Sequence, residues 1–208
     1  MNASQITLLD YGAGNLPSVE RALHRLGAQT ERVDSPEGLA QASALILPGV
    51  GHYAALIRAL DKNGLRDQLI AAIARGIPFL GICLGLQALY QTSEEAPDLQ
   101  GLNILQGSVR ALSGPVKLPH MGWNQLQTKS ASQLLEGIAP DSYFYFAHSY
   151  AAQSGNGHST SEVRATCLYG NEFVAVAEKE NIFAVQFHPE KSGDAGQRVL
   201  QNFLRIAA

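Results

Sequence analysis

A cysteine between two glycines stands where an apolar strand turns into a helix, and this junction constrains the fold more than any other segment. The run 77–82 is apolar, Cys83 follows it, and a helix-forming Leu-Gly-Leu-Gln-Ala sequence comes next. Gly81 and Gly85 flank the cysteine, at positions where side chains would clash with the backbone of a tight strand-to-helix turn. The pattern predicts a nucleophile elbow, in which the start of the helix favours the thiolate of Cys83.

A base for this thiolate is predicted near the other end of the chain. The strand-like run 181–187 ends in His188-Pro189-Glu190. Residues i and i+2 of an extended chain share a face, so His188 and Glu190 can lie side by side, while Pro189 ends the strand pairing. One imidazole nitrogen then takes the proton of Cys83 and the other donates to Glu190. The spacing predicts a Cys83-His188-Glu190 triad; the alternative is a buried inert cysteine and a structural histidine.

Apolar runs in the first half of the chain alternate with helix-forming segments. The expected strands lie at residues 6–10, 30–33 and 44–47, and the expected helices at about 18–26, 53–60 and 65–75. These strands are apolar throughout rather than at every second residue. They therefore indicate a parallel sheet that is covered by helices on both faces.

The second half of the chain has a different character from about residue 102 onward. Short strand-like runs separated by turns indicate an antiparallel extension, which a helix from about 195 to 206 closes. The polar, Gly/Ser-rich segment 153–161 is expected to be a surface loop. The strand-like runs are 108–112, 143–147, 165–168, 174–178 and 182–187. We therefore predict an α/β fold with a mostly parallel central sheet, helices on both faces and an antiparallel extension in the C-terminal half, as a single domain over residues 1–208.

Composition argues against several classes of function. The net charge is −3 and no cluster of Lys and Arg occurs, which argues against nucleic acid as a partner. No apolar run approaches a membrane span, and residues 1–5 do not resemble a signal peptide. With only Cys83 and Cys167 no disulfide framework is implied, so a free thiolate indicates a cytoplasmic protein, and Cys167 is expected to be buried and structural. No metal site and no cofactor are expected.

The elbow and the strand-terminal histidine resemble the motifs of the class I glutamine amidotransferases. Residues 81–87 are similar to the nucleophile elbow of this family, and residues 186–190 to its closing motif. Within the family the chain most resembles the glutaminase subunits of imidazole glycerol phosphate synthases. This narrower resemblance rests on segments 10–16, 47–52, 119–124 and 145–150, of which Pro119-His120-Met121-Gly122-Trp123-Asn124 is the most specific. It implies the class I glutamine amidotransferase fold, L-glutamine as substrate, and hydrolysis to glutamate through a cysteine thioester, with ammonia passed on for histidine biosynthesis.

Amide hydrolysis at Cys83 needs backbone donors for a tetrahedral oxyanion. One donor is expected to be the N–H of Leu84, directly after the nucleophile. The other is expected from Val50 or Gly51, because parallel-sheet enzymes place their sites at the carboxyl ends of strands. Gly49 and Gly51 would also allow a peptide of this loop to flip. The oxyanion hole is therefore expected to be incomplete at rest and to form only in response to a partner protein. The alternative is that residues 48–51 form an ordinary turn.

The resemblance implies contacts with the glutamine substrate. Gln87 lies one helical turn beyond the nucleophile, on the same face, and corresponds to a residue near the glutamine side chain. Glu95 resembles the acidic residue that receives the α-amino group, and the neighbouring Glu94 leaves a second register open. Ser149 and Tyr150 resemble the residues whose backbone holds the α-carboxylate.

Nothing in the sequence resembles an acceptor site for ammonia, such as a P-loop or a phosphate-binding glycine fingerprint. The acceptor must then lie on another polypeptide, and the resemblance implies a (β/α)₈-barrel cyclase subunit in a heterodimer. The same resemblance places Met121 and Trp123 on the face toward this partner; a plain core position is the alternative. The candidate docking residues are Asn15, His120, Met121, Trp123 and Lys191.

Two other functions remain open at this stage. The same motifs fit a glutaminase subunit that serves another acceptor, for example in pyridoxal phosphate, anthranilate or guanylate synthesis. A non-catalytic regulatory subunit is the second alternative, and the intact Cys83, His188 and Glu190 argue against it.

Overall fold

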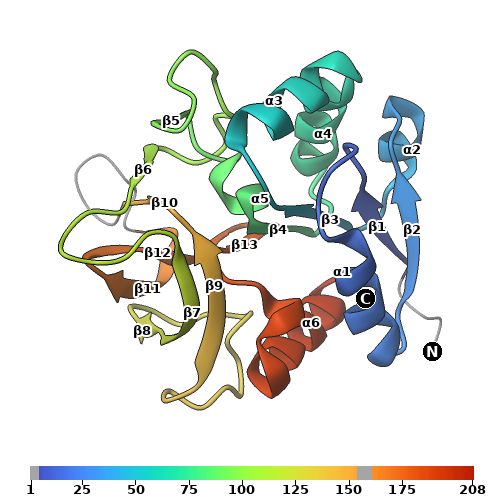
Figure 1. The fold of residues 1–208 in the computed structure, drawn as a ribbon. Coiled ribbons are helices and arrows are strands. Elements are labelled where there is room, and N and C mark those ends of the chain that lie inside the picture. The colour runs from blue at the N-terminus through green and yellow to red at the C-terminus, as the bar shows by residue number, and fades with distance from the viewer. Residues whose placement is uncertain (1–4, 154–160) are drawn as a thin grey trace.

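The fold is built on a central sheet whose strands run mostly parallel. The computed structural model describes residues 5–153 and 161–208, so most of the predicted 153–161 loop lies outside the described residues. In the described part the strand order is β2-β1-β3-β4-β13-β12-β11-β8 (Figure 1). The parallel strands are β1 (Gln5–Leu9), β2 (Gln29–Val33), β3 (Leu45–Gly49), β4 (Phe79–Cys83) and β13 (Ile182–Val185). The antiparallel strands are β12 (Asn171–Lys179), β11 (Val163–Tyr169) and β8 (Gln127–Thr128). The predicted fold class is confirmed.

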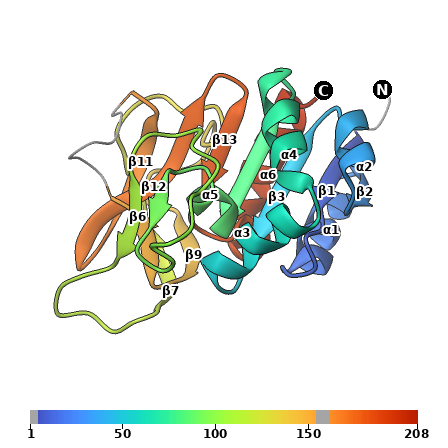
Figure 2. The same ribbon diagram turned by 90° about the horizontal axis from the view of Figure 1, so that it is seen from above.

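Helices cover both faces of the parallel strands (Figures 1 and 2). One face carries α3 (Tyr53–Lys62) and α4 (Leu65–Ala74), and the other carries α1 (Leu16–Arg25) and α6 (Gly193–Ile206). Side chains alternate between the two faces along a strand, so Leu45 and Leu47 pack in the first layer and Ile46 in the second. Every residue of β3 and β4 is buried. Burial on both faces explains why the sequences of these strands are continuously apolar.

Two smaller sheets lie beside the central one. The first contains β10 (Tyr150–Ala152), β6 (Ser108–Ala111) and β5 (Thr92–Ser93), and the second pairs β7 (His120–Gln125) with β9 (Tyr143–His148). Residues of β7 alternate between less and more exposed positions, so one side of this strand faces the solvent. The sequence analysis did not predict β7, because Gly122 and Asn124 have low strand propensity and its partner strand is distant in sequence.

Other elements also differ from the prediction. The short helix α2 (Pro36–Gln41) was missed, although Ser35 caps it and proline begins it, as helix starts prefer. The helix after the cysteine, α5 (Leu84–Gln87), has only four residues, and β13 ends two residues earlier than expected, at Val185. None of the helices in the described ranges has the length and hydrophobicity needed to cross a membrane.

Candidate active site

Cys83 occupies a strained turn at the end of β4. Its backbone has φ +54° and ψ −104°, a combination that costs a non-glycine residue about 1–3 kcal/mol. A Cβ added at Gly85 would lie 2.0 Å from the carbonyl oxygen of Leu47, and one at Gly81 would lie 2.8 Å from that of Gly85. The predicted role of the two glycines is thus confirmed, because the backbones cross too closely for side chains on either side of the cysteine.

The carboxyl ends of three neighbouring parallel strands bring the predicted catalytic segments together. Gly49 of β3 pairs with Cys83 of β4, and Val185 of β13 pairs with Ile82 on the other side of β4. The loop after β3 and the segment after β13 therefore flank the elbow, as the strand-end rule predicts.

His188 is paired with Glu190 beside the cysteine. Its Nδ1 lies 3.0 Å from Glu190 Oε1, and both side chains are almost fully buried. Glu190 belongs to the 3₁₀ turn η1 (Pro189–Lys191), so this turn, and not an extended chain as predicted, brings the two side chains together. Burial alone would lower the pKa of His188, but the charge of Cys83 and hydrogen bonds to Cys83 and Glu190 raise it to about 10. The imidazole is therefore held protonated between Cys83 and Glu190.

The loop after β3 lies against the elbow. A Cβ added at Gly49 would lie 2.6 Å from Leu84 Cβ, so only glycine permits this approach. Gly51 has φ +98°, and the space around it is open. The backbone amide of Val50 lies beside the buried hydroxyl of Tyr11: burial raises the pKa of Tyr11 to about 12, and this amide opposes the rise. Val50 and Gly51 of the loop and Leu84 of the elbow thus line the same cavity as Cys83.

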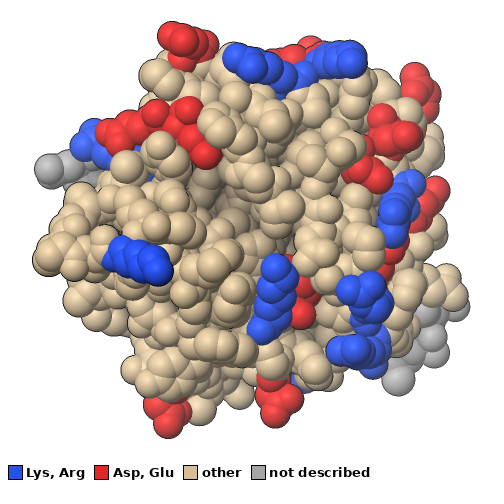
Figure 3. All heavy atoms as spheres, viewed as in Figure 1, with Lys and Arg blue, Asp and Glu red and all other residues tan. Residues whose placement is uncertain are grey.

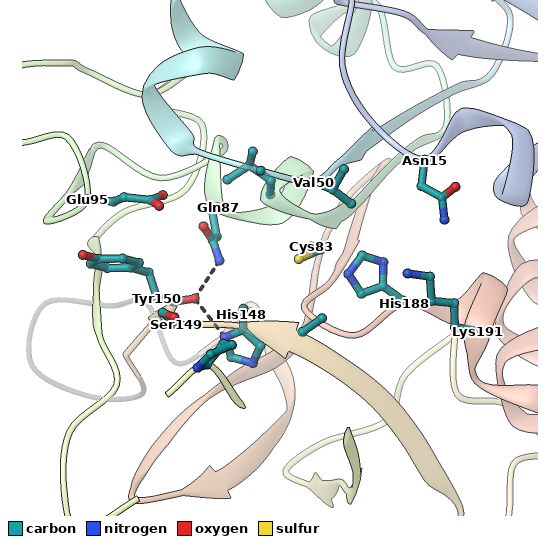
Figure 4. Close-up of a pocket in the computed structure, with 14 residues that line it drawn as sticks. Asn15, Val50, Cys83, Gln87, Glu95, His148, Ser149, Tyr150, His188 and Lys191 are labelled. Atoms are coloured by element: carbon teal, nitrogen blue, oxygen red, sulfur yellow. Dashed lines mark hydrogen bonds between the residues drawn. The ribbon is translucent and has the colours of Figure 1, made fainter. Parts of the chain in front are cut away.

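A cavity of about 420 Å³ opens beside the cysteine. Figure 4 shows Cys83 and His188 on one side of it, and Glu95 and Tyr150 toward the other. Glu190 contacts His188 and does not line the cavity. The other predicted catalytic, oxyanion and substrate residues all line it: Cys83, His188, Leu84, Val50, Gly51, Gln87, Glu95, Ser149 and Tyr150.

The structure decides between the two registers left open for the acidic residue. Glu95 lines the cavity, and its Oε2 accepts a hydrogen bond of 2.9 Å from the backbone N–H of Tyr53 at the start of α3. Glu94 instead accepts one from the backbone N–H of Ala111 and is more than half exposed. Only Glu95 therefore faces the cavity.

Gln186 and His148 also belong to the site, although the sequence analysis gave neither of them a role. Gln186 Nε2 donates to Cys83 Sγ over 3.5 Å, and its Oε1 accepts from Gln87 Nε2 over 3.1 Å. His148 lines the cavity. The position of Gln186 two residues before His188 could have indicated it, since alternate residues of an extended chain share a face.

The predicted docking residues separate into exposed and buried positions. Met121 is 67% exposed and Trp123 54%, so both are surface residues and not core. Asn15 and Lys191 line the cavity. On the face shown in Figure 3, most charged side chains lie toward the rim, and a basic side chain with acidic atoms beside it lies just below the centre. His120 corrects the prediction: its side chain is only 3% exposed, because it points inward from β7, and it does not reach the surface.

The second cysteine is not part of the lining of this cavity. Cys167 is fully buried, as predicted, and burial raises its pKa to about 12. Within residues 5–153 and 161–208, no group of three or more His, Cys, Asp or Glu side chains could hold a metal ion.

A strained cysteine elbow, a buried His–Glu pair and a polar cavity at the edge of a mostly parallel sheet define a cysteine-dependent amide hydrolase. The family model described as glutamine amidotransferase class-I matches residues 7–207. The chain is 48% identical to the imidazole glycerol phosphate synthase subunit HisH of Methanothermobacter thermautotrophicus, over 97% of this chain and 98% of that protein. The chain therefore belongs to the class-I glutamine amidotransferases, in the group of the HisH subunits.

Other relatives agree with this assignment. The HisH subunit of Moorella thermoacetica is 44% identical over 95% of this chain and 93% of its own. Imidazole glycerol phosphate synthase hisHF of Arabidopsis thaliana is 41% identical over 97% of this chain, which covers 34% of that protein. A solved structure described as a glutamine amidotransferase has a TM-score of 0.77 at 22% identity, over 97% of this chain and 98% of its own; it supports the fold.

Proposed function

We propose that this chain is the glutaminase subunit of an imidazole glycerol phosphate synthase, which hydrolyses L-glutamine at Cys83 and supplies ammonia to a cyclase subunit. The observation that carries the proposal is the contact of Cys83 with the His188–Glu190 pair at the wall of the cavity of about 420 Å³. A cavity of this size, with polar groups at the end away from the cysteine, suits an amino acid bound with its side-chain amide at the nucleophile.

The first half of the reaction uses the hydrogen bond between His188 and Cys83, across which the sulfur gives its proton to the imidazole. The thiolate attacks the side-chain carbonyl carbon of glutamine, and the oxyanion accepts hydrogen bonds from Leu84 N–H and from Val50 or Gly51 N–H. Each donor of this kind stabilises the transition state by about 3–4 kcal/mol. His188 then gives its proton to the leaving nitrogen, so ammonia departs and a γ-glutamyl thioester remains on Cys83.

The second half returns the enzyme to its starting state. Neutral His188 takes a proton from a water molecule as the water oxygen attacks the thioester carbon. The carbon–sulfur bond breaks, Cys83 leaves as thiolate, and glutamic acid ionises on release. Throughout, Glu190 accepts from His188 Nδ1, which keeps the other imidazole nitrogen directed at the reacting atoms.

Substrate recognition is assigned to the end of the cavity away from the cysteine. The carboxylate of Glu95 is placed to receive the α-ammonium group of glutamine, and the backbone of Ser149 and Tyr150 to hold its α-carboxylate. Gln87 lies between these groups and Cys83 (Figure 4), where it would contact the aliphatic part and the amide of the substrate.

Ammonia released into water at neutral pH becomes ammonium, which is not a nucleophile, so it has to reach its acceptor within a complex. We assign the acceptor site to a (β/α)₈-barrel cyclase partner. The name hisHF of the Arabidopsis relative, of which this chain covers 34%, supports a close link between the two activities. Met121, Trp123, Asn15 and Lys191 are the proposed docking residues. A thiol that must stay free suits a reducing compartment, and we place the complex in the cytoplasm.

Replacing Cys83 with Ala or Ser tests the function. In the complex with the cyclase subunit, we expect both variants to lose glutamine-dependent turnover and to keep turnover with added ammonium salts, because only the glutaminase step needs the thiolate. Cys167→Ala is the matched control, since Cys167 lies outside the cavity and its loss should spare both activities. Wild-type turnover with glutamine in Cys83→Ala would contradict the assignment.

A further inference from the structure

Two buried histidines lie where β7 and β9 pair, on the inner side of the strand that exposes Met121 and Trp123. His120 and His148 are opposite each other in the strand register and are 3% and 7% exposed. The ring of His120 stacks on Tyr169, with a centroid distance of 3.9 Å. The mechanism above gives neither histidine a role.

The hydrogen bonds of this pair run in one direction. His148 Nδ1 lies 2.9 Å from the carbonyl oxygen of Tyr150, and a carbonyl only accepts, so Nδ1 carries the hydrogen. Burial lowers the pKa of His148 to about 3, so the ring is neutral and its Nε2 is an acceptor. His120 Nδ1, at 3.3 Å from that Nε2, is therefore the donor. Burial also lowers the pKa of His120, to about 4, so this ring is neutral as well. Its Nε2 carries no hydrogen and accepts from Asn124 Nδ2, which lies 3.5 Å away.

This series of hydrogen bonds reaches the wall of the active-site cavity. The carbonyl oxygen of Tyr150 also accepts from Gln87 Nε2 over 2.7 Å, and Figure 4 shows both bonds converging on it. Gln87 continues to Gln186, which donates to Cys83 Sγ. Asn124 on β7 is thus connected to the nucleophile through side chains and one backbone carbonyl.

We propose that His120 and His148 are positioning residues for the glutamine-binding end of the cavity, acting through the Tyr150 carbonyl and Gln87. The inference rests on the proposed function, because it takes the cavity as the glutamine site. His148 is not a second base: its Nδ1 is bound to Tyr150 and its Nε2 faces His120, so neither nitrogen is free for the substrate. Removing the His120 donor would leave His148 Nε2 buried without a partner, and the Tyr150 segment would shift to relieve it.

The test compares two variants of His120 in the complex with its cyclase subunit. His120→Phe keeps an aromatic ring to stack on Tyr169 but removes the donor, and we expect the KM for glutamine to rise about tenfold with kcat within about threefold of wild type. His120→Asn loses the stacking but keeps an N–H group near the place of Nδ1, and its KM should lie closer to wild type. A wild-type KM in His120→Phe together with a raised KM in His120→Asn would show that only packing matters, and would overturn the proposal.

Two further measurements keep the outcome clear. Turnover with ammonium salts should be unchanged in both variants, because it does not use the glutamine site. In ¹⁵N spectra of histidine-labelled protein at neutral pH, both rings should be neutral with the hydrogen on Nδ1; a charged ring or the other tautomer at His148 would contradict the inference. Failure of the proposed function would show differently, as glutamine turnover that survives Cys83→Ala.

Discussion

At the scale of single residues, the reactive sulfur is held by backbone geometry as much as by side chains. Cys83 has a positive φ, and the glycines around it allow β4, α5 and the loop after β3 to approach within contact distance. Strain at such a position persists only where the surrounding structure fixes it. The elbow is therefore sensitive to any side chain that enlarges its neighbours.

Gly85→Ala measures this sensitivity. The new Cβ would lie 2.0 Å from the Leu47 carbonyl oxygen, and because a backbone atom of a central strand cannot move away cheaply, we expect a loss of about 3 kcal/mol or more in the free energy of unfolding. Gly27→Ala is the control: Gly27 has φ +83° with open space around it, so only the backbone preference of about 1 kcal/mol is lost. Urea unfolding compares the two, and equal losses would argue against a tight elbow.

The two partners of the cysteine should differ in importance. We expect His188→Asn to slow labelling of Cys83 by a glutamine-derived chloroketone by about 10²–10⁴-fold, because the imidazole holds the proton that would otherwise sit on sulfur. Glu190→Gln should slow it less, since Glu190 only orients and stabilises the ring. Intact mass spectrometry follows the labelling; equal rates for wild type and His188→Asn would contradict the role of His188.

At the scale of secondary-structure elements, the β7–β9 pair has a solvent-exposed side and a buried side. Met121 and Trp123 are exposed, while His120 and His148 are buried. Protonation of a buried neutral histidine destabilises the folded state, because the charged ring is not hydrated there. The pairing of these strands should therefore depend on pH.

Acid should destabilise the fold partly through these histidines. Their pKa values are lowered to about 4 for His120 and about 3 for His148, below the ordinary value of about 6.5, so between these limits the unfolded chain binds more protons than the folded one. The contribution of the two neutral histidines to the free energy of unfolding is thus fully present above about pH 6.5. It falls as the pH drops, by up to about 1.4 kcal/mol per pH unit for each histidine. Urea unfolding from pH 7 to 5 should show a shallower loss in His120→Phe than in wild type. Parallel curves for the two proteins would show that His120 does not contribute.

The sequence predicted the elements around the nucleophile better than those around the substrate. Continuous apolar runs identified the parallel strands, because burial on both faces leaves no other pattern. The inward direction of His120 was missed, since the resemblance of segment 119–124 to a family motif identifies residue types and not which side of a strand each one faces. Gln186 was missed although it lies two residues before His188, because the glutamine side chain has no acid–base chemistry of its own and its role depends on its contacts with Cys83 and Gln87.

At the scale of the whole molecule, the cavity and the exposed Met121–Trp123 strand lie close enough for a docked partner to influence both. Ser149 and Tyr150 follow β9, the partner strand of β7, and line the cavity. The loop of Val50 and Gly51 lines it too. A partner bound over this region could control glutamine hydrolysis by adjusting one peptide.

Partner control gives a prediction for the isolated chain. We expect it to hydrolyse glutamine slowly, and the acceptor-bound cyclase subunit to raise the rate a hundredfold or more, which needs only about 3 kcal/mol and matches one oxyanion donor. Gly51→Pro should reduce the stimulated rate and spare glutamine binding, because proline cannot adopt the φ of +98° found at Gly51. Gly49 is unsuitable for this test, since any added atom there meets Leu84. Ammonia release with and without the partner decides: a full rate in the isolated chain would remove the need for coupling.

The position of β13 in the sheet has a consequence for the synthesis and folding of the chain. This strand lies between β4 and β12 in the middle of the sheet, yet it is the last strand in the sequence. His188 follows Cys83 by 105 residues (188 minus 83). A ribosome that adds about 5–20 residues per second needs roughly 5–20 s to synthesise this stretch. During that interval the elbow cysteine emerges without its base. A nascent chain therefore exposes an ordinary thiol, and it consumes no glutamine until the sheet closes around its last strand.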